Sequence, residues 1–305
     1  MNWKKITLYI LLSFSFSWTA ALIMKLADID YSSVTALIMV GGLYMPGPAI
    51  ATFVIQKFIY KESFQQYGWA FDKKSYKWLL FTPLLFIILI GLTFGTIALF
   101  GNTDLIPEFG AIDFSQDNFT NRFKDLSASK MGADKVKLPN IPIWLFLPLA
   151  IVQGIVAGAT INLPFMFGEE FGSRGLMQKE TQKLGFLKSN VFIGTVWGLW
   201  HLPIILMGHN YPHHPYFGII MMCLMTIALS PAFAYVRFKT KSILGPCLLH
   251  GMINATAAIF ALFIVNGNEL YSSIAGWAGV IAGVIIAFGI YVFDKPFVRD
   301  YIWME

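Results

Sequence analysis

Charged residues are scarce in this chain. They make up only 13% of the 305 residues, whereas 56% of the residues are hydrophobic and the mean hydropathy is +0.63. An ordinary soluble domain carries about 25% charged residues. This chain therefore has too little charge to cover a soluble globule of 34.2 kDa, and the composition indicates a membrane protein.

Cysteine is rare as well, and the basic residues never cluster. Cys223 and Cys247 both lie inside apolar segments, which argues against an extracellular disulfide framework. The net charge of +5 comes from basic residues that sit between apolar blocks. Because these residues form no patch, nucleic-acid binding is a poor explanation of the charge.

The chain does contain apolar blocks of about bilayer length. A hydrocarbon core of about 30 Å needs roughly 20 helical residues, because backbone polar groups there must bond internally. We therefore predict an all-α polytopic membrane protein with about eight transmembrane helices. The predicted spans are Ile6–Met24, Val34–Phe58, Trp78–Phe100, Pro142–Phe167, Asn190–Met207, Gly218–Val236, Ile243–Val265 and Ser273–Phe293. The fourth is the least regular, since it contains Pro148 and Pro164, and proline permits a kink.

Lysine and arginine predict the orientation of the spans, because these residues concentrate on the cytoplasmic side. The N-terminus, the segments 57–77, 174–188 and 237–241, and the C-terminal tail together hold 16 of the 22 basic residues. Both termini are therefore predicted to be cytoplasmic. The stretch 101–141 is predicted to be an extracytoplasmic insert. No internal repeat is visible, so residues 1–305 are expected to form a single transmembrane domain.

Ionisable groups in membrane spans are costly and therefore point to function. The first cluster is the segment 168–175, at the cytoplasmic end of the fourth span. In a helix, Glu170 and Arg174 are i,i+4 neighbours that can pair. Glu169 is rotated by about 100° from Glu170 and can face a cavity. The alternative interpretation is a solvated helix end with an ordinary surface pair.

Two further clusters contain histidine. His201 follows Trp197 by one turn and lies about 16 Å from the cytoplasmic end of the fifth span. In the seventh span, the i,i+4 spacing places His250 and Asn254 on one face, about 10 and 16 Å from the cytoplasm. The alternatives are a satisfied packing role for His201 and interhelical hydrogen bonding for the other two.

Together the clusters predict a hydrolytic site. A carboxylate, two histidines and an asparagine belong to three helices that enter from one side, so they can line one cavity open to the cytoplasm. Such a set can activate water with a base and stabilise an oxyanion with neutral donors. This chemistry needs no nucleophilic serine or cysteine.

The three motifs resemble those of the CPBP family, which joins the CAAX proteases and the bacteriocin-processing enzymes and is also called the ABI family. The motifs are Glu-Glu-x-x-x-Arg at Glu169–Arg174, aromatic-x-x-x-His at Trp197–His201 and His-x-x-x-Asn at His250–Asn254. The resemblance covers roughly residues 140–265. It implies an intramembrane glutamic endopeptidase, similar to the Ras-converting CAAX prenyl endopeptidase, that cleaves a membrane-anchored or lipidated peptide, CAAX-type and prenylated in some members.

The resemblance also implies roles for single positions. Glu169 would activate water with the help of His201, while the residues of the third motif would stabilise the oxyanion. The implied catalytic set is Glu169, His201, His250 and Asn254, and the supporting set is Glu170, Arg174 and Trp197. The second motif commonly begins with phenylalanine, so Trp197 leaves the shape of the pocket in doubt. No metal, cofactor or covalent intermediate is implied.

The depth of Glu169 fits a straight helix poorly. If the fourth span began at Pro142 and ran straight, Glu169 would lie about 40 Å along it, beyond the hydrocarbon core. Tilt, a break near Pro164 or a later start would each bring it back to the depth of His250.

Other protease classes stay open. A zinc-dependent membrane metalloprotease would use glutamate and two histidines, although His-Glu-x-x-His is absent. A cysteine protease would pair Cys247 with His250, but nothing nearby is predicted to activate the thiol. The loop His209–Pro215 is interpreted as an interfacial turn because of its two prolines, with metal binding as the alternative.

Roles without catalysis are the remaining alternatives. A membrane scaffold or a bacteriocin self-immunity protein would bind a peptide and keep the motifs for structure. A transporter would also place polar groups inside spans, but the internal symmetry of many transporters is absent. The intact motifs favour the enzyme.

Overall fold

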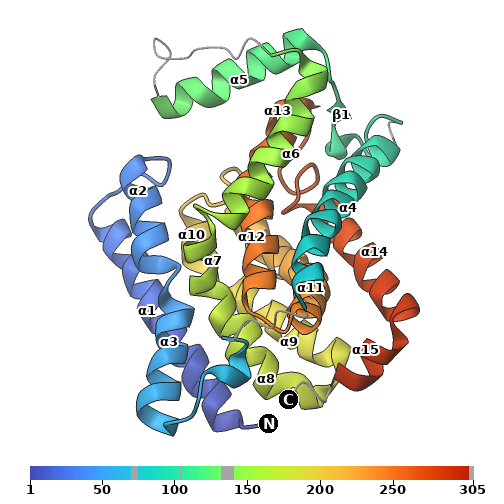
Figure 1. Ribbon diagram of the computed structural model, residues 1–305. Coiled ribbons are helices and arrows are strands. Elements are labelled where there is room, and N and C mark those ends of the chain that lie inside the picture. Colours follow the sequence, from blue (N-terminus) through green and yellow to red (C-terminus); the bar gives the residue numbers. More distant parts are fainter. Residues whose placement is uncertain (70–74, 104, 132–140, 302–305) are drawn as a thin grey trace.

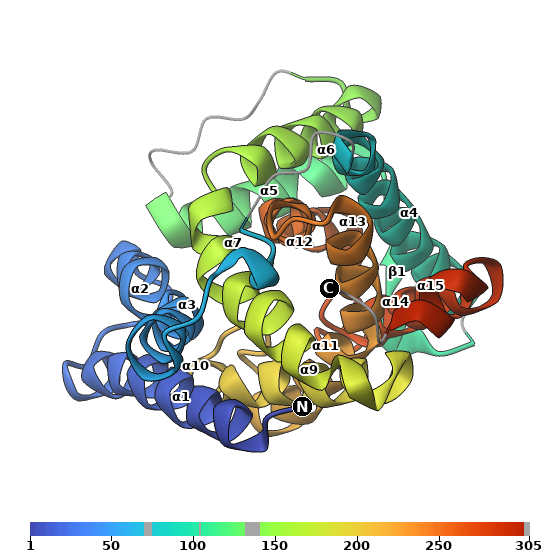
Figure 2. The same ribbon diagram turned by 60° about the horizontal axis from the view of Figure 1, so that its bottom comes forward.

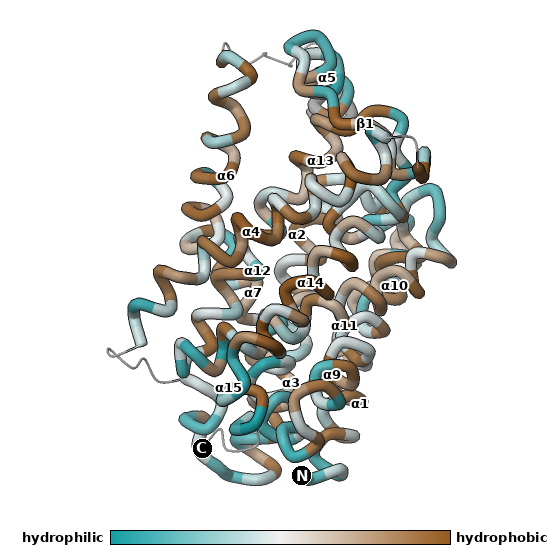
Figure 3. The backbone as a smooth tube through the Cα atoms, turned by 90° about the vertical axis from the view of Figure 1, so that its right-hand side faces the viewer, coloured by the Kyte–Doolittle hydropathy of each residue, from teal (hydrophilic) through white to brown (hydrophobic). Residues whose placement is uncertain are grey.

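The computed structural model describes residues 1–69, 75–103, 105–131 and 141–301. It is built almost entirely of helices, with one two-stranded sheet, which confirms the predicted all-α class (Figure 1). Apolar residues occupy the middle of the molecule, and hydrophilic residues gather at its two ends (Figure 3). This distribution is the one expected of a chain that crosses a bilayer.

The N-terminal part is an antiparallel pair of helical segments. Helix α1 (Trp3–Leu26) packs against a return path made of α2 (Val34–Met39), the π-helix η1 (Val40–Tyr44), α3 (Gly47–Val54) and the π-helix η2 (Ile55–Tyr60). Side chains cap both starts, since Asn2 accepts from the Lys5 N–H and Ser33 accepts from the Ala36 N–H. The 3₁₀ turn η3 (Gln65–Tyr67) then precedes the long helix α4 (Tyr76–Phe100).

The insert after α4 folds back over one end of the molecule. It contains the 3₁₀ turn η5 (Pro107–Phe109), strand β1 (Ala111–Ile112) and helix α5 (Gln116–Met131), which lies across that end (Figure 1). Strand β1 pairs antiparallel with β2 (Ile264–Val265). The insert is thereby joined to the segment that follows the third motif.

The fourth predicted span is broken in the middle. Helix α6 (Ile143–Ala159) and the helix that starts at α7 (Leu163–Glu170) meet at a bend of 63°. Pro164 occupies the first turn of α7, where its missing N–H costs no hydrogen bond. The second half continues through the π-helix η7 (Phe171–Met177), α8 (Gln178–Thr181) and the 3₁₀ turn η8 (Gln182–Leu184). Of the three possibilities that the sequence left open for the depth of Glu169, the structure shows a break close to Pro164.

The remaining helices surround α11 (Pro215–Thr240), which packs against α9 (Phe186–Trp200), α12 (Leu244–Thr256) and α14 (Trp277–Phe293). The short helices α10 (Leu202–Leu206), α13 (Ala258–Phe263) and α15 (Lys295–Asp300) complete the chain. Helix α12 lies closely against α6, because Gly158 and Gly251 meet there. A Cβ atom on Gly251 would come within 2.8 Å of the Gly158 Cα atom, so a larger residue requires the helices to separate.

The structure supports a multi-pass chain but only part of the predicted spans by length and composition. Among the described residues, five helical segments are long and apolar enough to cross a membrane, and the bent α6–α7 pair makes six. The two predicted spans at Asn190–Met207 and Ser273–Phe293 are helical but short. Helix α9 has 15 residues before it ends at His201, and α14 has 17. The count of eight is therefore not confirmed, whereas the multi-pass membrane character is.

The N-terminus and helix α15, the last described helix, lie at the same end of the molecule, opposite the end that carries α5 (Figures 1 and 2). The helices run between these two ends in alternating directions. Neither cysteine is in a disulfide, since Cys223 and Cys247 are both free thiols.

Candidate functional site

Glu169 comes from the last turn of α7, just after the bend. The bend carries this turn back among the other helices, and the Glu169 side chain is only 3% exposed. Gly168 permits this position, because a Cβ atom there would lie 2.6 Å from the backbone oxygen of Met45. A straight helix would place this carboxylate outside the hydrocarbon core. The bend and Gly168 together explain why it is buried instead.

Trp197 joins two of the predicted catalytic residues. Its indole Nε1 donates a hydrogen bond of 2.9 Å to Glu169 Oε2, and its backbone oxygen lies 2.8 Å from His201 Nδ1. A carbonyl can only accept, so His201 Nδ1 carries the proton and Nε2 keeps a free lone pair. The Trp197 ring also meets the ring of His250 edge-on, with centroids 5.2 Å apart.

Glu170, Arg174 and His250 form a buried polar cluster. Arg174 Nη1 lies 3.2 Å from Glu170 Oε2, and His250 Nδ1 lies 2.8 Å from Glu170 Oε1. Arg174 also donates to Ser230 Oγ at 3.2 Å and stacks over the Trp197 ring, 4.4 Å from its centroid. The predicted i,i+4 pair of Glu170 and Arg174 is present. Because both side chains are buried, the alternative interpretation of a solvated helix end is wrong.

Asn254 lies one turn beyond His250 on α12, and its side chain is the most exposed of the four predicted catalytic residues. Its Nδ2 lies 3.4 Å from the Met166 Sδ atom of α7. Thioether sulfur is a weak acceptor. The amide is therefore held only lightly and keeps its capacity to donate to another group.

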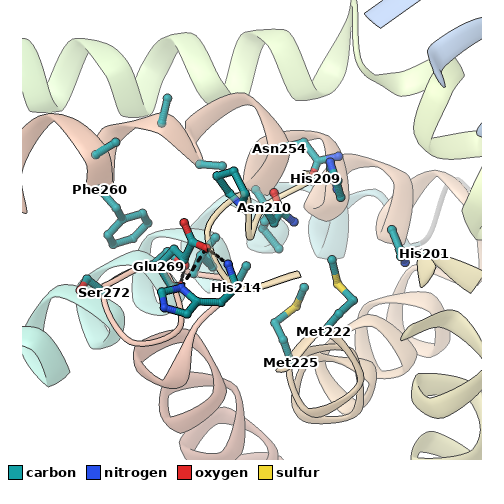
Figure 4. Close-up of a pocket in the computed structure, with 18 of the residues that line it drawn as sticks. His201, His209, Asn210, His214, Met222, Met225, Asn254, Phe260, Glu269 and Ser272 are labelled. Carbon is teal, nitrogen blue, oxygen red and sulfur yellow. Dashed lines mark hydrogen bonds and ion pairs between the residues drawn. The ribbon is translucent and has the colours of Figure 1, made fainter. Parts of the chain in front are cut away.

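All four residues of the predicted catalytic set line one cavity of about 1410 Å³. Trp197 and Trp200 also line it, and Figure 4 shows His201 and Asn254 on its wall, on different helices. The structure thus brings the three motifs together at a single cavity. The supporting residues Glu170 and Arg174 lie behind this wall and reach the cavity through His250 and Trp197.

The cavity extends from the predicted catalytic set to loops that lie far from it in the sequence. The loop residues that line the cavity belong to the segments 209–214 and 266–275, and α5 also contributes to the lining. Helix α5 lies at the end of the molecule opposite the N-terminus (Figure 1). The sequence predicted cytoplasmic termini and a cavity open to the cytoplasm. The cytoplasmic opening stays a prediction from the sequence, and the lining adds that the cavity also reaches α5 and these loops.

Several cavity residues were not singled out by the sequence as part of the site. The ring of His209 lies parallel to that of His201 at 6.0 Å, and its Nδ1 hydrogen-bonds the hydroxyl of Tyr31 at 2.8 Å. Burial lowers the pKa of His209 to about 4, so this ring is neutral at pH 7. Its place in a proline-containing turn gave no sign of this contact, since Tyr31 is distant in sequence.

Two features bear on the alternative protease classes. Cys247 is fully buried and lies outside the set of residues that line the cavity. Among the described parts of the chain, no group of three or more histidine, cysteine, aspartate or glutamate side chains is arranged to hold a metal ion. In the loop after α10, His213 and His214 instead contact Glu269.

The comparison with protein families agrees with the motifs. Residues 139–256 match the family model described as Type II CAAX prenyl endopeptidase Rce1-like, and the match includes all three motifs. No curated protein matches the chain. The family implies a membrane endopeptidase. Residues 139–256 are therefore similar to the Rce1-like endopeptidases of the CPBP family, as the resemblance of the motifs predicted.

Proposed function

We propose that this protein is an intramembrane glutamic endopeptidase that hydrolyses a membrane-associated peptide inside the cavity without a metal ion. The observation that carries the proposal is the shared cavity: Glu169, His201, His250 and Asn254 come from three separate motifs and line the same space. A prenylated CAAX-type peptide is the first substrate class to test, because the family model that matches the chain is described by that activity.

Glu169 is proposed to be the general base. Its carboxylate takes a proton from a water molecule, and the resulting hydroxide attacks the carbonyl carbon of the scissile peptide bond. Trp197 fixes the carboxylate through the 2.9 Å hydrogen bond to Oε2, which leaves Oε1 for the water. His201 assists because its Nδ1 is occupied by the Trp197 carbonyl, so its Nε2 accepts the second hydrogen of the same water.

The third motif is proposed to stabilise the tetrahedral oxyanion. Asn254 donates through its amide, which the weak contact with Met166 leaves available. His250 presents a second polar group to the same cavity. Glu170, 2.8 Å from His250 Nδ1, orients the ring, and Arg174 holds Glu170 in place.

Collapse of the intermediate completes the reaction. The carbonyl re-forms as the bond between carbon and nitrogen breaks, and the departing amine takes the proton that Glu169 removed from water. One water molecule is consumed, and the products are a carboxylic acid and an amine. Binding the anchored end of the substrate from the lipid side would hold the scissile bond near Glu169.

The test is a cleavage assay on purified protein in detergent with a library of lipidated C-terminal peptides. Wild type, Glu169→Ala and an EDTA-treated wild type are compared. The proposal expects cleavage by wild type with and without EDTA, and a loss of at least about 10²-fold in Glu169→Ala. Loss of cleavage in EDTA would favour the zinc metalloprotease.

Two further arms address the remaining alternatives. Cys247→Ala is expected to keep full activity, whereas a cysteine protease would lose it. In a deletion strain, Glu169→Gln is expected to fail to restore the phenotype. Full complementation by Glu169→Gln and by His250→Ala would favour the scaffold or self-immunity protein.

A further inference from the structure

The insert after α4 forms one wall of the cavity mouth. Helix α5 is fixed there by Phe119, which is 1% exposed and packs on Phe146 with ring centroids 4.4 Å apart. Arg122 Nη2 also donates to the backbone oxygen of Ile264 at 3.2 Å. Three residues of α5 line the cavity: Arg122, Asp125 and Leu126. Helix α5 of the insert is therefore an integral part of the cavity wall.

The facing wall contains a contact between two loops, in which Glu269 binds His213 and His214; we call this contact the clasp. Glu269 accepts hydrogen bonds from the backbone N–H groups of His213 and His214 at 2.8 and 2.9 Å. The Nδ1 atoms of the same two histidines lie 2.9 and 3.2 Å from its carboxylate (Figure 4). Because Glu269, His213 and His214 all line the cavity, the clasp holds the mouth in its observed shape.

The site itself forms the opposite end of the cavity, since the lining contains no described residue of the segments 174–188, 237–241 or 294–301. Glu170 and Arg174 are 0% and 2% exposed and lie behind Glu169 and His250, on the side of the termini. Phe233 packs over Arg174, 4.4 Å from its guanidinium carbon, and extends this floor. A peptide that reaches Glu169 from the aqueous phase therefore approaches from the end that carries α5.

The distribution of charge assigns a side of the membrane to each end. By sequence, the segments at the mouth end (25–33, 101–142, 207–214 and 264–276) hold six of the 22 basic residues but nine of the 17 acidic residues. The segments at the end with the termini hold the other 16 basic residues. Because lysine and arginine concentrate in cytoplasmic loops, the termini face the cytoplasm and the mouth faces away from it.

We propose that the cavity opens on the extracytoplasmic face and that its substrate is a peptide segment presented at the outer surface of the membrane. This inference rests on the proposed function, since it takes the cavity to be the place of cleavage. It changes the substrate class: the cleaved segment must lie outside the cytoplasm, either because it is anchored in the outer leaflet or because it has been translocated.

The sidedness is tested by labelling single cysteines in intact cells. Asp125→Cys at the mouth and Lys188→Cys at the other end, both at exposed positions, are made in a Cys223→Ala, Cys247→Ala background. A membrane-impermeant maleimide is expected to label Asp125→Cys in intact cells and Lys188→Cys only after permeabilisation. The reverse pattern overturns the proposal without using any activity measurement.

The substrate side is tested by cleavage in oriented vesicles. A quenched-fluorescence peptide library with a membrane-impermeant sulfonated dye is added outside right-side-out vesicles, outside inside-out vesicles, and to the detergent-solubilised protein. We expect cleavage at least about tenfold faster in right-side-out than in inside-out vesicles. Faster cleavage in inside-out vesicles, with cleavage in detergent retained, overturns the extracytoplasmic substrate and leaves the proposed endopeptidase standing. Absence of cleavage in all three samples overturns the endopeptidase itself, and the labelling alone then decides the direction of the mouth.

Discussion

The indole nitrogen of Trp197 donates a 2.9 Å hydrogen bond to the carboxylate of Glu169, 28 residues earlier in the chain. The same tryptophan accepts from His201 through its backbone oxygen and meets the ring of His250 edge-on. Phenylalanine, common at this position in the family that the motifs resemble, would keep the ring and the carbonyl but lose the N–H donor. In this chain Trp197 is therefore a positioning residue for the proposed base.

Trp197→Phe is expected to lower kcat by about tenfold and to leave KM nearly unchanged. The substitution keeps the aromatic packing and removes only the hydrogen bond that orients Glu169, and such outer contacts are typically worth 10–100-fold in activity. Steady-state kinetics in detergent measure both constants. An unchanged kcat would show that the indole N–H has no part in the orientation of the carboxylate.

Glu170→Gln is expected to reduce both stability and turnover. The introduced amide can still accept a hydrogen bond from His250 but leaves the buried Arg174 without a counter-charge, which costs about 3–5 kcal/mol in comparable buried pairs. The Tm in detergent and kcat of the folded fraction are measured. Ser230→Ala is the matched control, because it removes one hydrogen bond of Arg174, worth about 1 kcal/mol, and keeps the ion pair. Equal kcat values for the two variants would contradict the role of Glu170.

Asn254→Ala is expected to lower kcat by about 10²–10³-fold, the usual cost of losing one oxyanion donor. Asn162→Ala is its matched control, since Asn162 also lies against α12 but donates to the backbone oxygen of Gly251 at 2.9 Å. The control is expected to lower the Tm while kcat changes by less than about threefold. A similar loss of kcat in both variants would assign Asn254 a purely structural role.

The Asp294 carboxylate makes stability depend on pH. Burial alone would raise the pKa of Asp294, but hydrogen bonds from Lys239, 2.6 Å away, and from the Phe297 N–H outweigh it and hold the pKa below its ordinary value. A carboxyl with a lowered pKa stabilises the fold at pH values above its unfolded pKa of about 4, and this contribution is lost as the pH falls through the lowered value.

Asp294→Asn is therefore expected to lower the Tm at pH 7 by the equivalent of about 1 kcal/mol and to remove this part of the acid dependence. Asparagine keeps the capping acceptor for the Phe297 N–H, so the variant isolates the charge. Thermal unfolding between pH 3 and pH 7 measures the effect. A Tm difference from wild type that stays constant over this range would contradict the assignment.

Local chemistry explains why part of the site could be predicted from the sequence. The i,i+4 spacing placed Glu170 beside Arg174 and His250 beside Asn254 on their helices, and both relations follow from helical geometry alone. Pro164 also indicated where a break was possible, because proline cannot continue a regular helix without losing a hydrogen bond. Tilt and a later start were equally compatible with the sequence, and the observed bend shows that the break occurs.

Contacts between segments that are distant in the sequence could not be predicted. The bond from Trp197 to Glu169 depends on how α9 packs against α7, and no spacing encodes that distance. The depth of each motif was counted from its cytoplasmic helix end, which predicted a cavity open to the cytoplasm. That α5 and the loops that hold His213 and Glu269 line the cavity could not be predicted, because their positions depend on tertiary packing.

The most direct test of the account is the kcat of Glu169→Gln, measured in detergent on the same peptide as wild type. Glutamine is nearly isosteric with glutamate and still accepts the hydrogen bond from Trp197, so the fold and the cavity are kept while the base is lost. The account predicts a fall of about 10²–10⁴-fold in kcat with an unchanged Tm. Wild-type turnover in Glu169→Gln would contradict the central claim that this carboxylate activates the attacking water.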